Sequence, residues 1–458
     1  MKKLLHSLCL FCSLTSANAQ WSELGTGADA LNANSAIWSI ALDHSGNLYA
    51  AGGFTDSNGK EYVAKWDGKS WSEVGTNSNA LNANNIINPI TVDDSGNIYA
   101  AGHFSDPSGF YYVAKWNGTS WSELGTGSNA LQSINFINSI IVDNSGNVYT
   151  NAYYDYPPST SYIYNILKWD GINWTSLGNN NSLNPNDYIV PIVLDKLGNI
   201  YAAGNFTDGN GKQYVAKWNG SNWSELGTGS NALNANNTIL TMAVDSYENV
   251  YVAGNFTDAN SNSYVAKWNG ITWSELGTDS NALNTNSTIT SITLDNFENV
   301  YIAGYYTNIS GKGFAAKWDG INWKELGAGS NILNQADLVS SILVDDTGNV
   351  YVAGLSTDIN GKWFVAKYSQ STDVTAITST SNSISITAYP NPTTGSLTIT
   401  TPEAGQVVVY SALGEVVTTQ AVQAGNTIIS LGNAPTGLYT FLLTGQNNSY
   451  APVKVAKD

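Results

Sequence analysis

The residues best able to carry out chemistry are few and scattered in this chain. Beyond the first nineteen residues it has two histidines, His44 and His103, and no cysteine, since Cys9 and Cys12 both lie in that segment. A nucleophilic triad needs a serine or cysteine placed by a histidine, and no recognisable serine motif is present. Two histidines could join a carboxylate around zinc, but these two fall in different copies of a repeat. Nucleophilic catalysis, metal catalysis and a bound cofactor are therefore disfavoured.

Acidic residues dominate the charge. The chain has 35 Asp and Glu against 18 basic residues, all of them lysine, and a formal net charge of −17. Binding to nucleic acid is disfavoured because it needs clustered cations that displace counterions. The absence of arginine also excludes sialidase-type chemistry, which clamps a carboxylate between guanidinium groups. Carboxylate pairs for glycoside hydrolysis stay open, because spacing alone does not exclude them.

Repeated acidic turns raise the question of calcium. Asp93-Asp94 and Asp208-Gly-Asn-Gly211 are examples. Calcium needs six to eight converging oxygens, and no copy spaces several carboxylates like an EF-hand loop. Aspartate and asparagine also favour tight turns unaided, so turn chemistry is the preferred interpretation and no metal site is predicted.

One segment returns seven times at intervals of about 50 residues and sets the architecture. Each copy contains four short stretches rich in β-branched and aromatic residues, for example 238–245, 249–256, 264–268 and 273–277. Four antiparallel strands per copy match one propeller blade, so residues 20–368 are predicted to form an all-β, seven-bladed β-propeller. The copies begin at Trp21, Trp71, Trp121, Trp174, Trp223, Trp273 and Trp323.

The two ends of the repeat region indicate how the ring closes. The first copy begins with the outer strand Trp21-Ser-Glu-Leu-Gly25, whereas the last copy stops after Tyr368 and lacks such a strand. We therefore expect the N-terminal strand to complete the seventh blade, which leaves fewer exposed sheet edges. The tight turns 245–249 and 269–272 should then share one face of the disc. The longer links 257–262 and 277–286 should share the other, which we call the polar face and which has more freedom to bind a ligand.

Positions that recur in every copy are best explained as blade structure. Glu248 and Glu298 replace the glycine found in the other tight turns, which favours the following asparagine as the left-handed residue of the turn. A lysine precedes an aromatic residue in each copy, and packing, with a possible cation–π contact, explains these Lys-Trp pairs better than a ligand does. The asparagines are Asn47, Asn97, Asn147, Asn199, Asn249, Asn299 and Asn349, and the lysines are Lys65, Lys115, Lys168, Lys217, Lys267, Lys317 and Lys367.

The third copy breaks the symmetry and is the candidate binding region. It gains three residues, has Ala152 in place of the usual glycine, and gathers five tyrosines on a link of the polar face. Exposed tyrosines suit sugar stacking or protein contact. The alternative is a drifted blade whose tyrosines pack its own longer loop. The candidate binding residues are Tyr153, Tyr154, Tyr156, Tyr162 and Tyr164.

The segments outside the repeats indicate export. Residues 1–19 have the basic start, short apolar run and small-residue end of a signal peptide, with cleavage expected between Ala19 and Gln20. No later run is long and apolar enough to predict a transmembrane segment. Residues 369–387 are a Ser/Thr-rich linker, and residues 388–458 alternate short strands with Gly and Pro turns, which predicts a small β-sandwich.

Two resemblances follow from these motifs. The stretch Asp93-Asp-Ser-Gly-Asn-Ile-Tyr-Ala-Ala-Gly102 resembles bacterial β-propeller repeats, a class that implies no single activity. The C-terminal unit resembles the type A sorting domain of the type IX secretion system of Bacteroidota, although Ser411 and Ala434 depart from its common residues. That resemblance implies Sec export, contact with the type IX machinery, removal of the domain, and surface attachment or release. The residues that carry it are Tyr389, Pro390, Asn391, Pro392, Gly395, Gly414, Gly437, Tyr439, Lys454 and Lys457.

These observations predict a secreted or surface-displayed binding scaffold for protein or glycan, without enzymatic activity. An enzyme acting on extracellular polysaccharide is the alternative, and it requires carboxylates from different blades in one pocket of the polar face. A structural surface-layer element without a specific ligand is the second alternative.

Overall fold

The structure is a computed structural model of the 458-residue chain. It divides into two compact units, Met1–Ser371 and Thr372–Asp458, which are described separately. The described residues are 20–131, 133, 136–155, 162–178, 183–278, 281–283, 285, 287–307, 313–327, 338–358, 360–369, 387–401, 404–411, 416–432, 434–445 and 453–457. The predicted signal peptide, with Ala19, lies outside them, and the first strand begins at Gln20.

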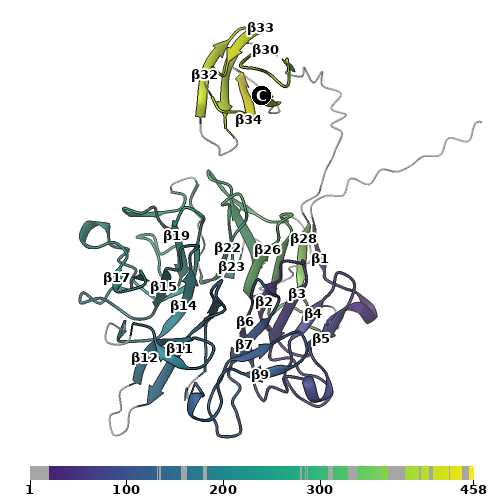
Figure 1. Ribbon diagram of the computed structural model, residues 1–458, viewed down its shortest axis with the longest axis vertical. Coiled ribbons are helices and arrows are strands. Elements are labelled where there is room, and N and C mark those ends of the chain that lie inside the picture. The colour runs from purple at the N-terminus through teal and green to yellow at the C-terminus, as the bar shows by residue number, and fades with distance from the viewer. Residues whose placement is uncertain are drawn as a thin grey trace, which may run out of the picture. The chain divides into compact units, whose positions relative to one another are not determined.

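The first unit contains seven antiparallel sheets of four strands each (Figure 1). Each sheet takes consecutive strands except the last, in which β1 pairs with β28. From inner to outer strand, blade 1 consists of β2 (Ile37–Leu42), β3 (Leu48–Gly52), β4 (Ala64–Trp66) and β5 (Trp71–Glu73), and blade 2 of β6 (Ile87–Val92), β7 (Ile98–Gly102), β8 (Ala114–Trp116) and β9 (Trp121–Glu123). Blade 3 consists of β10 (Ile140–Val142), β11 (Val148–Asp155), β12 (Tyr162–Trp169) and β13 (Trp174–Ser176), blade 4 of β14 (Ile189–Leu194), β15 (Ile200–Gly204), β16 (Ala216–Trp218) and β17 (Trp223–Glu225), and blade 5 of β18 (Ile239–Val244), β19 (Val250–Gly254), β20 (Ala266–Trp268) and β21 (Trp273–Glu275). Blade 6 consists of β22 (Ile289–Leu294), β23 (Val300–Thr307), β24 (Gly313–Trp318) and β25 (Trp323–Glu325), and blade 7 of β26 (Val339–Val344), β27 (Val350–Gly354), β28 (Ala366–Ser369) and β1 (Gln20–Glu23). Short 3-10 turns follow four outer strands, at Gly27–Asp29, Asn77–Asn79, Gly127–Asn129 and Gly229–Asn231.

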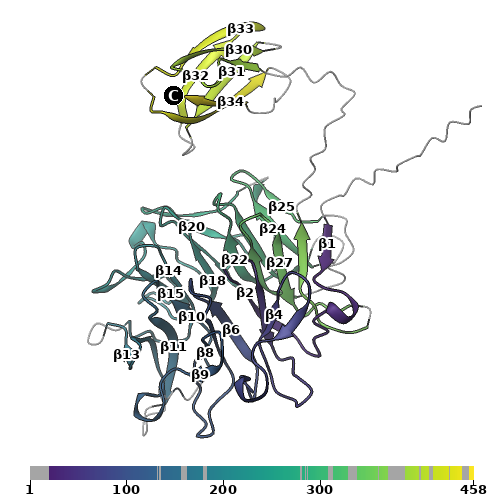
Figure 2. The same cartoon turned by 45° about the vertical axis from the view of Figure 1, so that its right-hand side comes forward.

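The sheets form a closed ring. The first strand of each blade contacts the first strand of the next, from β2 to β6 and onward to β26, which returns to β2. These strands therefore surround the central axis, and Figure 2 shows β14, β18 and β22 following one another around it. Strand β1 pairs with β28, with Trp21 opposite Tyr368. The predicted seven-bladed propeller, closed by its N-terminal strand, is confirmed.

The hydrophobic core lies between neighbouring blades. Tyr49 and Val63 of blade 1, for example, form one cluster with Ile87, Ile98 and Phe104 of blade 2. Fully burying one such side chain contributes roughly 1.5–3 kcal/mol, so repeated pairs of blades supply the main stabilisation.

Tryptophans of the outer strands connect neighbouring blades with hydrogen bonds. The indole Nε1 of Trp21 donates to the Leu326 carbonyl of the preceding blade at 3.0 Å, across the closure of the ring. The same bond, at 2.7–2.8 Å, is made by Trp71, Trp121, Trp174, Trp273 and Trp323. Trp223 differs, because its Nε1 is buried without a hydrogen-bond partner among the described residues. Its neighbour is blade 3, the copy that breaks the symmetry.

This difference gives a matched test of the connecting bond. Trp273→Phe should lower the free energy of unfolding by about 1 kcal/mol more than Trp223→Phe, because only the former removes a hydrogen bond. Both changes remove the same atoms from half-buried positions. Chemical denaturation of the two variants measures the difference, and equal losses would show that the indole bond contributes nothing to stability.

The tight turn after each inner strand is organised by one aspartate. Asp43 Oδ1 accepts the backbone N–H groups of Ser45 and Asn47, each at 2.9 Å. Its Oδ2 accepts Asn47 Nδ2 at 2.7 Å and the Tyr49 hydroxyl at 3.0 Å. The same four bonds recur in the other six blades, at Asp93, Asp143, Asp195, Asp245, Asp295 and Asp345.

One detail of this turn differs from the prediction. The left-handed residue is Gly46 and its equivalents, with φ near +80°, and not the asparagine that follows it. Glu248 and Glu298 occupy that position with φ of +64° and +63°. The lysine ammonium lies over the tyrosine ring of the neighbouring strand, 4.9–5.7 Å from the centroid, and not over the adjacent tryptophan. The strand register decides this, since Lys65 lies directly opposite Tyr49.

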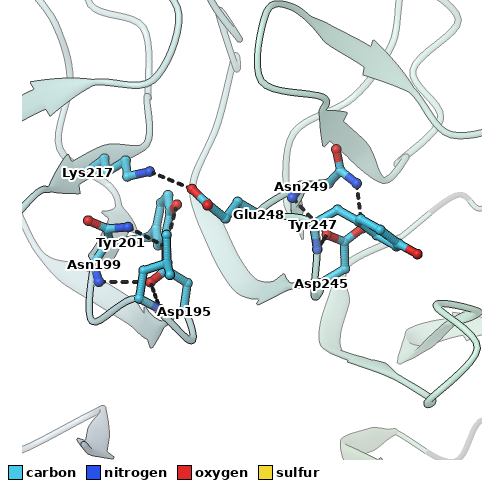
Figure 3. Close-up of polar contacts among 9 residues, drawn as sticks. Asp195, Asn199, Tyr201, Lys217, Asp245, Tyr247, Glu248 and Asn249 are labelled. Atoms are coloured by element: carbon cyan, nitrogen blue, oxygen red, sulfur yellow. Dashed lines mark hydrogen bonds and ion pairs between the residues drawn. The ribbon is translucent and has the colours of Figure 1, made fainter.

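The two glutamates use their strained position to reach a neighbouring blade. Glu248 Oε2 pairs with Lys217 Nζ of blade 4 at 3.4 Å (Figure 3). Glu298 accepts hydrogen bonds from the backbone and hydroxyl groups of Ser246 in blade 5. A half-exposed ion pair contributes at most about 1 kcal/mol, which only offsets the cost of the left-handed backbone.

We predict that Glu248→Gly is about 1 kcal/mol more stable than Glu248→Ala. Both variants lose the ion pair with Lys217, but only glycine relieves the strain of a positive φ. Thermal unfolding of both variants checks this. If alanine were the more stable of the two, φ at this position would not be strained.

The second unit is a sandwich of two antiparallel sheets. The sheets have the strand orders β29-β30-β33 and β32-β31-β34-β35 and enclose one apolar core that includes Ile399, Val409 and Phe441. The two sheets confirm the small β-sandwich predicted for this part of the chain. The strands are β29 (Thr387–Tyr389), β30 (Ser396–Thr401), β31 (Gly405–Tyr410), β32 (Val416–Val422), β33 (Gly425–Ser430), β34 (Gly437–Gly445) and β35 (Val453–Lys457).

Candidate functional site

In six blades the ends of two strands meet near the axis on the polar face. There the residue that precedes the inner strand lies beside the residue that follows the glycine of the second strand, as in the bond from His103 N to Ile86 O. In blade 3, Phe136 and Tyr153 have the equivalent sequence positions. We call these fourteen positions the axial ring. They differ between copies that are otherwise nearly identical. By blade they are Ala36 and Gly53, Ile86 and His103, Phe136 and Tyr153, Tyr188 and Asn205, Thr238 and Asn255, Thr288 and Tyr305, and Leu338 and Leu355.

Blades 2, 3 and 4 contribute an aromatic cluster to this ring. The His103 ring stacks on Phe136 with centroids 4.5 Å apart and planes inclined by 12°. Tyr153 contacts Phe136 at 6.2 Å and lies edge-on to Tyr164 and Tyr188 at 5.4 and 5.3 Å. Tyr188 is 39% exposed, so the cluster presents an aromatic surface to solvent.

A local rearrangement of blade 3 makes this cluster possible. In blade 1, a Cβ at Gly52 would lie 2.1 Å from the Ala36 carbonyl oxygen, so this close approach of two strands needs glycine. Blade 3 has Ala152 there, and its inner strand pairs over only three residues. The Asn151 side chain replaces the lost pairing, because its Oδ1 accepts the backbone N–H groups of Asn138 and Ser139 at 3.0 Å.

The rest of this network holds Tyr153. Asn151 Nδ2 donates to the Tyr153 hydroxyl and to the Ile189 carbonyl of blade 4, both at 3.0 Å. The Tyr153 hydroxyl donates to the same carbonyl at 3.0 Å. Tyr153 is 1% exposed, so it packs beneath the exposed aromatic residues and does not contact solvent.

Polar side chains continue the ring through blades 4 to 6. Asn205 Nδ2 donates to Asp187 Oδ2 at 2.5 Å, and Asn205 Oδ1 accepts the Thr238 hydroxyl at 2.8 Å. Asn255 Oδ1 accepts the Thr288 hydroxyl at 2.6 Å. One side of the axis is therefore aromatic and the other carries amide, hydroxyl and carboxylate groups.

The predicted tyrosines divide into three groups. The structure brings Tyr153 and Tyr164 together in the cluster, with Tyr153 buried and Tyr164 half-buried. Tyr154 and Tyr162 lie on β11 and β12, where only their backbone is described, and Tyr156 lies outside the described residues. The sequence analysis missed Phe136 and Tyr188. The signal that could have found them is an aromatic residue at a position where the other copies have Ala, Ile, Thr or Leu.

Burial shifts the protonation of the cluster toward the neutral forms. It raises the pKa of Tyr153 to about 12 and lowers the pKa of His103 below its ordinary value of 6.5. Among the described residues, no group of three or more His, Cys, Asp or Glu is arranged to hold a metal ion. The turn aspartates bind their own backbone, since Asp208 Oδ1 accepts the N–H groups of Asn210 and Lys212.

The sorting motif joins segments that are far apart in sequence. Asn391 Oδ1 accepts the Ala456 N–H at 2.9 Å, and Thr393 N donates to the Ala456 carbonyl at 2.8 Å. Lys457 Nζ donates to the carbonyl of Ala434. The Tyr439 hydroxyl donates to the Pro435 carbonyl at 2.5 Å. The three segments therefore meet at one end of the sandwich.

The remaining motif residues take varied positions. Tyr389, Pro390 and Pro392 are exposed, with Tyr389 at 50%. Gly395 and Gly437 have φ of +150° and +155°. Gly414 lies outside the described residues, and only the backbone of Lys454 is described.

Residues 387–456 match the family described as "Secretion system C-terminal sorting domain". The chain is a β-propeller protein with a type IX sorting domain. It is thereby exported through the type IX system to the cell surface or the extracellular space. In the described part of the chain, no helix has the length and apolar character needed to cross a membrane.

No curated protein matches the chain in sequence. Among solved structures, PorZ is similar, an essential bacterial surface component of the type IX secretion system of Porphyromonas gingivalis. It shares 15% identity at a TM-score of 0.49, and the match covers 92% of this chain and 59% of the PorZ chain. A fungal alcohol oxidase shares 12% identity at a TM-score of 0.48, covering 96% of this chain and 99% of its own. The lectin SapL1, in complex with alpha methyl fucoside, shares 16% identity at a TM-score of 0.39 and covers 63% of this chain and 94% of its own.

The lowered pKa of His103 predicts a pH dependence of stability. The unfolded chain binds this proton more readily than the folded one, so His103 favours folding above its ordinary pKa near 6.5 and lowers stability as the pH falls through that value. The melting temperature should therefore fall less between pH 7.5 and 5.5 in His103→Gln than in the unmodified protein. His44→Gln, at an exposed histidine, should keep the original slope. Equal slopes for all three proteins would mean that the stacked histidine titrates normally.

Proposed function

We propose that the propeller is a binding module that the type IX system exports, and that it holds an extracellular glycan or protein at its axial ring. The observation that carries this proposal is the aromatic cluster of His103, Phe136, Tyr153, Tyr164 and Tyr188. It joins three blades and stands beside the polar groups of Asp187 and Asn205. A partly exposed aromatic surface next to hydrogen-bonding groups is typical of recognition sites, where the rings provide contact area and the polar groups provide orientation.

Binding is favoured over catalysis by the placement of the acids. A polysaccharide-acting enzyme of the expected kind would bring carboxylates of different blades into one pocket. In the described part of the chain, the carboxylate pairs whose repulsion raises the pKa of a glutamate each belong to a single blade. They are Glu23 with Asp358, Glu73 with Asp56, Glu123 with Asp106, and Glu225 with Asp208.

Arrays of glycans and of purified envelope proteins, probed with the full chain, would identify the ligand. Tyr188→Ala should then weaken binding about tenfold, the effect of losing one partly exposed aromatic contact. Tyr247→Ala is the matched control, because Tyr247 is 72% exposed on the opposite, tight-turn face. Arrays that stay blank at high micromolar concentration would favour a structural surface-layer element. An equal loss in both variants would show that the axial ring is not the site.

A further inference from the structure

A second kind of cavity lies away from the axis, between the outer strand of a blade and the link from the preceding blade. In blade 2 it has a volume of about 370 Å³ and is lined by Asp106, Tyr112, Trp121 and Glu123, with Lys60 and Asn82 from blade 1. In blade 4 a cavity of about 440 Å³ is lined by the equivalent Asp208, Tyr214, Trp223 and Glu225. We call this cavity the blade pocket.

The same residue set occupies this position in three further blades. Blade 1 has Asp56, Tyr62, Trp71 and Glu73, and blade 5 has Asp258, Tyr264, Trp273 and Glu275. Blade 7 has Asp358, Phe364, Trp21 and Glu23, with phenylalanine in place of tyrosine. Blade 6 keeps Glu325 but has Asn308 where the others have aspartate. The cavity is therefore observed in blades 2 and 4, and its residues recur in sequence in blades 1, 5 and 7.

The walls of the pocket are held rigidly. Tyr112 lies edge-on to the fully buried Phe104, with centroids 4.9 Å apart and planes at 84°. The equivalent pairs in blades 1, 4 and 5 repeat this geometry within 2°. In blade 2 Trp121 is also fixed by its indole bond to the Val74 carbonyl, a bond that the equivalent Trp223 of blade 4 does not make. An aromatic wall that is ordered before binding loses little conformational entropy when a ligand arrives.

The pocket contains two side chains that only accept hydrogen bonds, Asp106 and Glu123, beside donors such as Lys60 and Asn82. Glu123 and Asp106 lie close enough that burial and mutual repulsion raise the pKa of Glu123. Two neighbouring carboxylates can accept hydrogen bonds from the adjacent hydroxyl groups of an uncharged polyol such as a sugar. An anionic ligand would be repelled by the two acids. In blade 2 a cationic ligand would meet the ammonium group of Lys60, which lines the same pocket.

We propose that the blade pockets each bind one neutral saccharide unit, so that the propeller engages a glycan at several points. The aromatic walls would contact the apolar face of the sugar, and the Glu–Asp pair would accept its hydroxyl hydrogens. Simultaneous engagement of linked pockets can raise avidity by 10²–10⁴ over a single site. This inference rests on the proposed binding role, but it concerns sites distinct from the axial ring.

Native mass spectrometry of the full chain tests the proposal by counting bound sugars. The probes are methyl glycosides of glucose, galactose, mannose, fucose and N-acetylglucosamine, followed by a polysaccharide of whichever sugar binds. We expect more than one and up to five bound equivalents, and at least 100-fold tighter binding of the polysaccharide per chain. Glu123→Ala should remove one equivalent and leave the affinity of the others unchanged. It should not lower the melting temperature, because it removes a repelled carboxylate.

Two controls separate this inference from the proposed function. Glu325→Ala, at the same outer-strand position of blade 6, should keep every equivalent. Tyr188→Ala at the axial ring should also keep them, even where it abolishes binding of an array ligand. The inference is overturned if no glycoside binds at tens of millimolar, or if a single equivalent binds and is lost in Tyr188→Ala. Binding of lysine methyl ester in place of the glycosides would overturn it in favour of a cationic ligand.

Discussion

The aspartate of the tight turn is the interaction on which every blade depends. Its carboxylate accepts four hydrogen bonds, two from the backbone of the turn and two from asparagine and tyrosine side chains. Burial alone would raise the pKa of Asp93, yet the bonds from Asn97, Tyr99 and Ser95 outweigh it and lower the pKa. The tyrosine held by this aspartate is also a core residue. In blade 1, for example, Asp43 accepts the Tyr49 hydroxyl, and Tyr49 packs against blade 2. One acid therefore links the turn, the strand and the contact between blades.

Because these bonds are satisfied within one blade, the same segment can be repeated without new partners. Neighbouring blades are joined mainly by apolar packing and by the indole bond to a backbone carbonyl. Hydroxyl groups of the inner strands add bonds to the next blade, as from Ile90 N to Ser39 Oγ at 3.1 Å. At the axial ring the two strands of one blade are also joined through the backbone, as between His103 N and Ile86 O of blade 2. Side chains at the axial ring are consequently free to vary. This freedom explains why the copies differ there and stay alike elsewhere.

The parts of the fold that follow from the repeat of about 50 residues could be predicted from the sequence. The spacing of Trp21 and its equivalents predicted seven blades, and the missing outer strand of the last copy predicted the closure by β1. Features that depend on backbone dihedral angles or on strand register could not be predicted in this way. The left-handed residue of the tight turn depends on φ, so the interpretation that favoured the asparagine was wrong. The possible cation–π contact of Lys65 is present, but strand register makes Tyr49 its partner. Of the predicted tyrosines, Tyr153 and Tyr164 lie together in the aromatic cluster. Their exposure could not be predicted, because Tyr153 is buried through Asn151 and a carbonyl of the next blade.

The blade pockets were missed for a related reason. Glu123 and Asp106 are seventeen residues apart in sequence, and Lys60 comes from another blade, so no local motif contains them. Repetition also concealed them, since features present in every copy are most simply explained as structure. The two explanations are compatible here. Trp121 joins two blades through its Nε1 while it lines the pocket of blade 2. A residue that holds the ring together can thus be repeated for stability and still give the propeller several equivalent surfaces for binding.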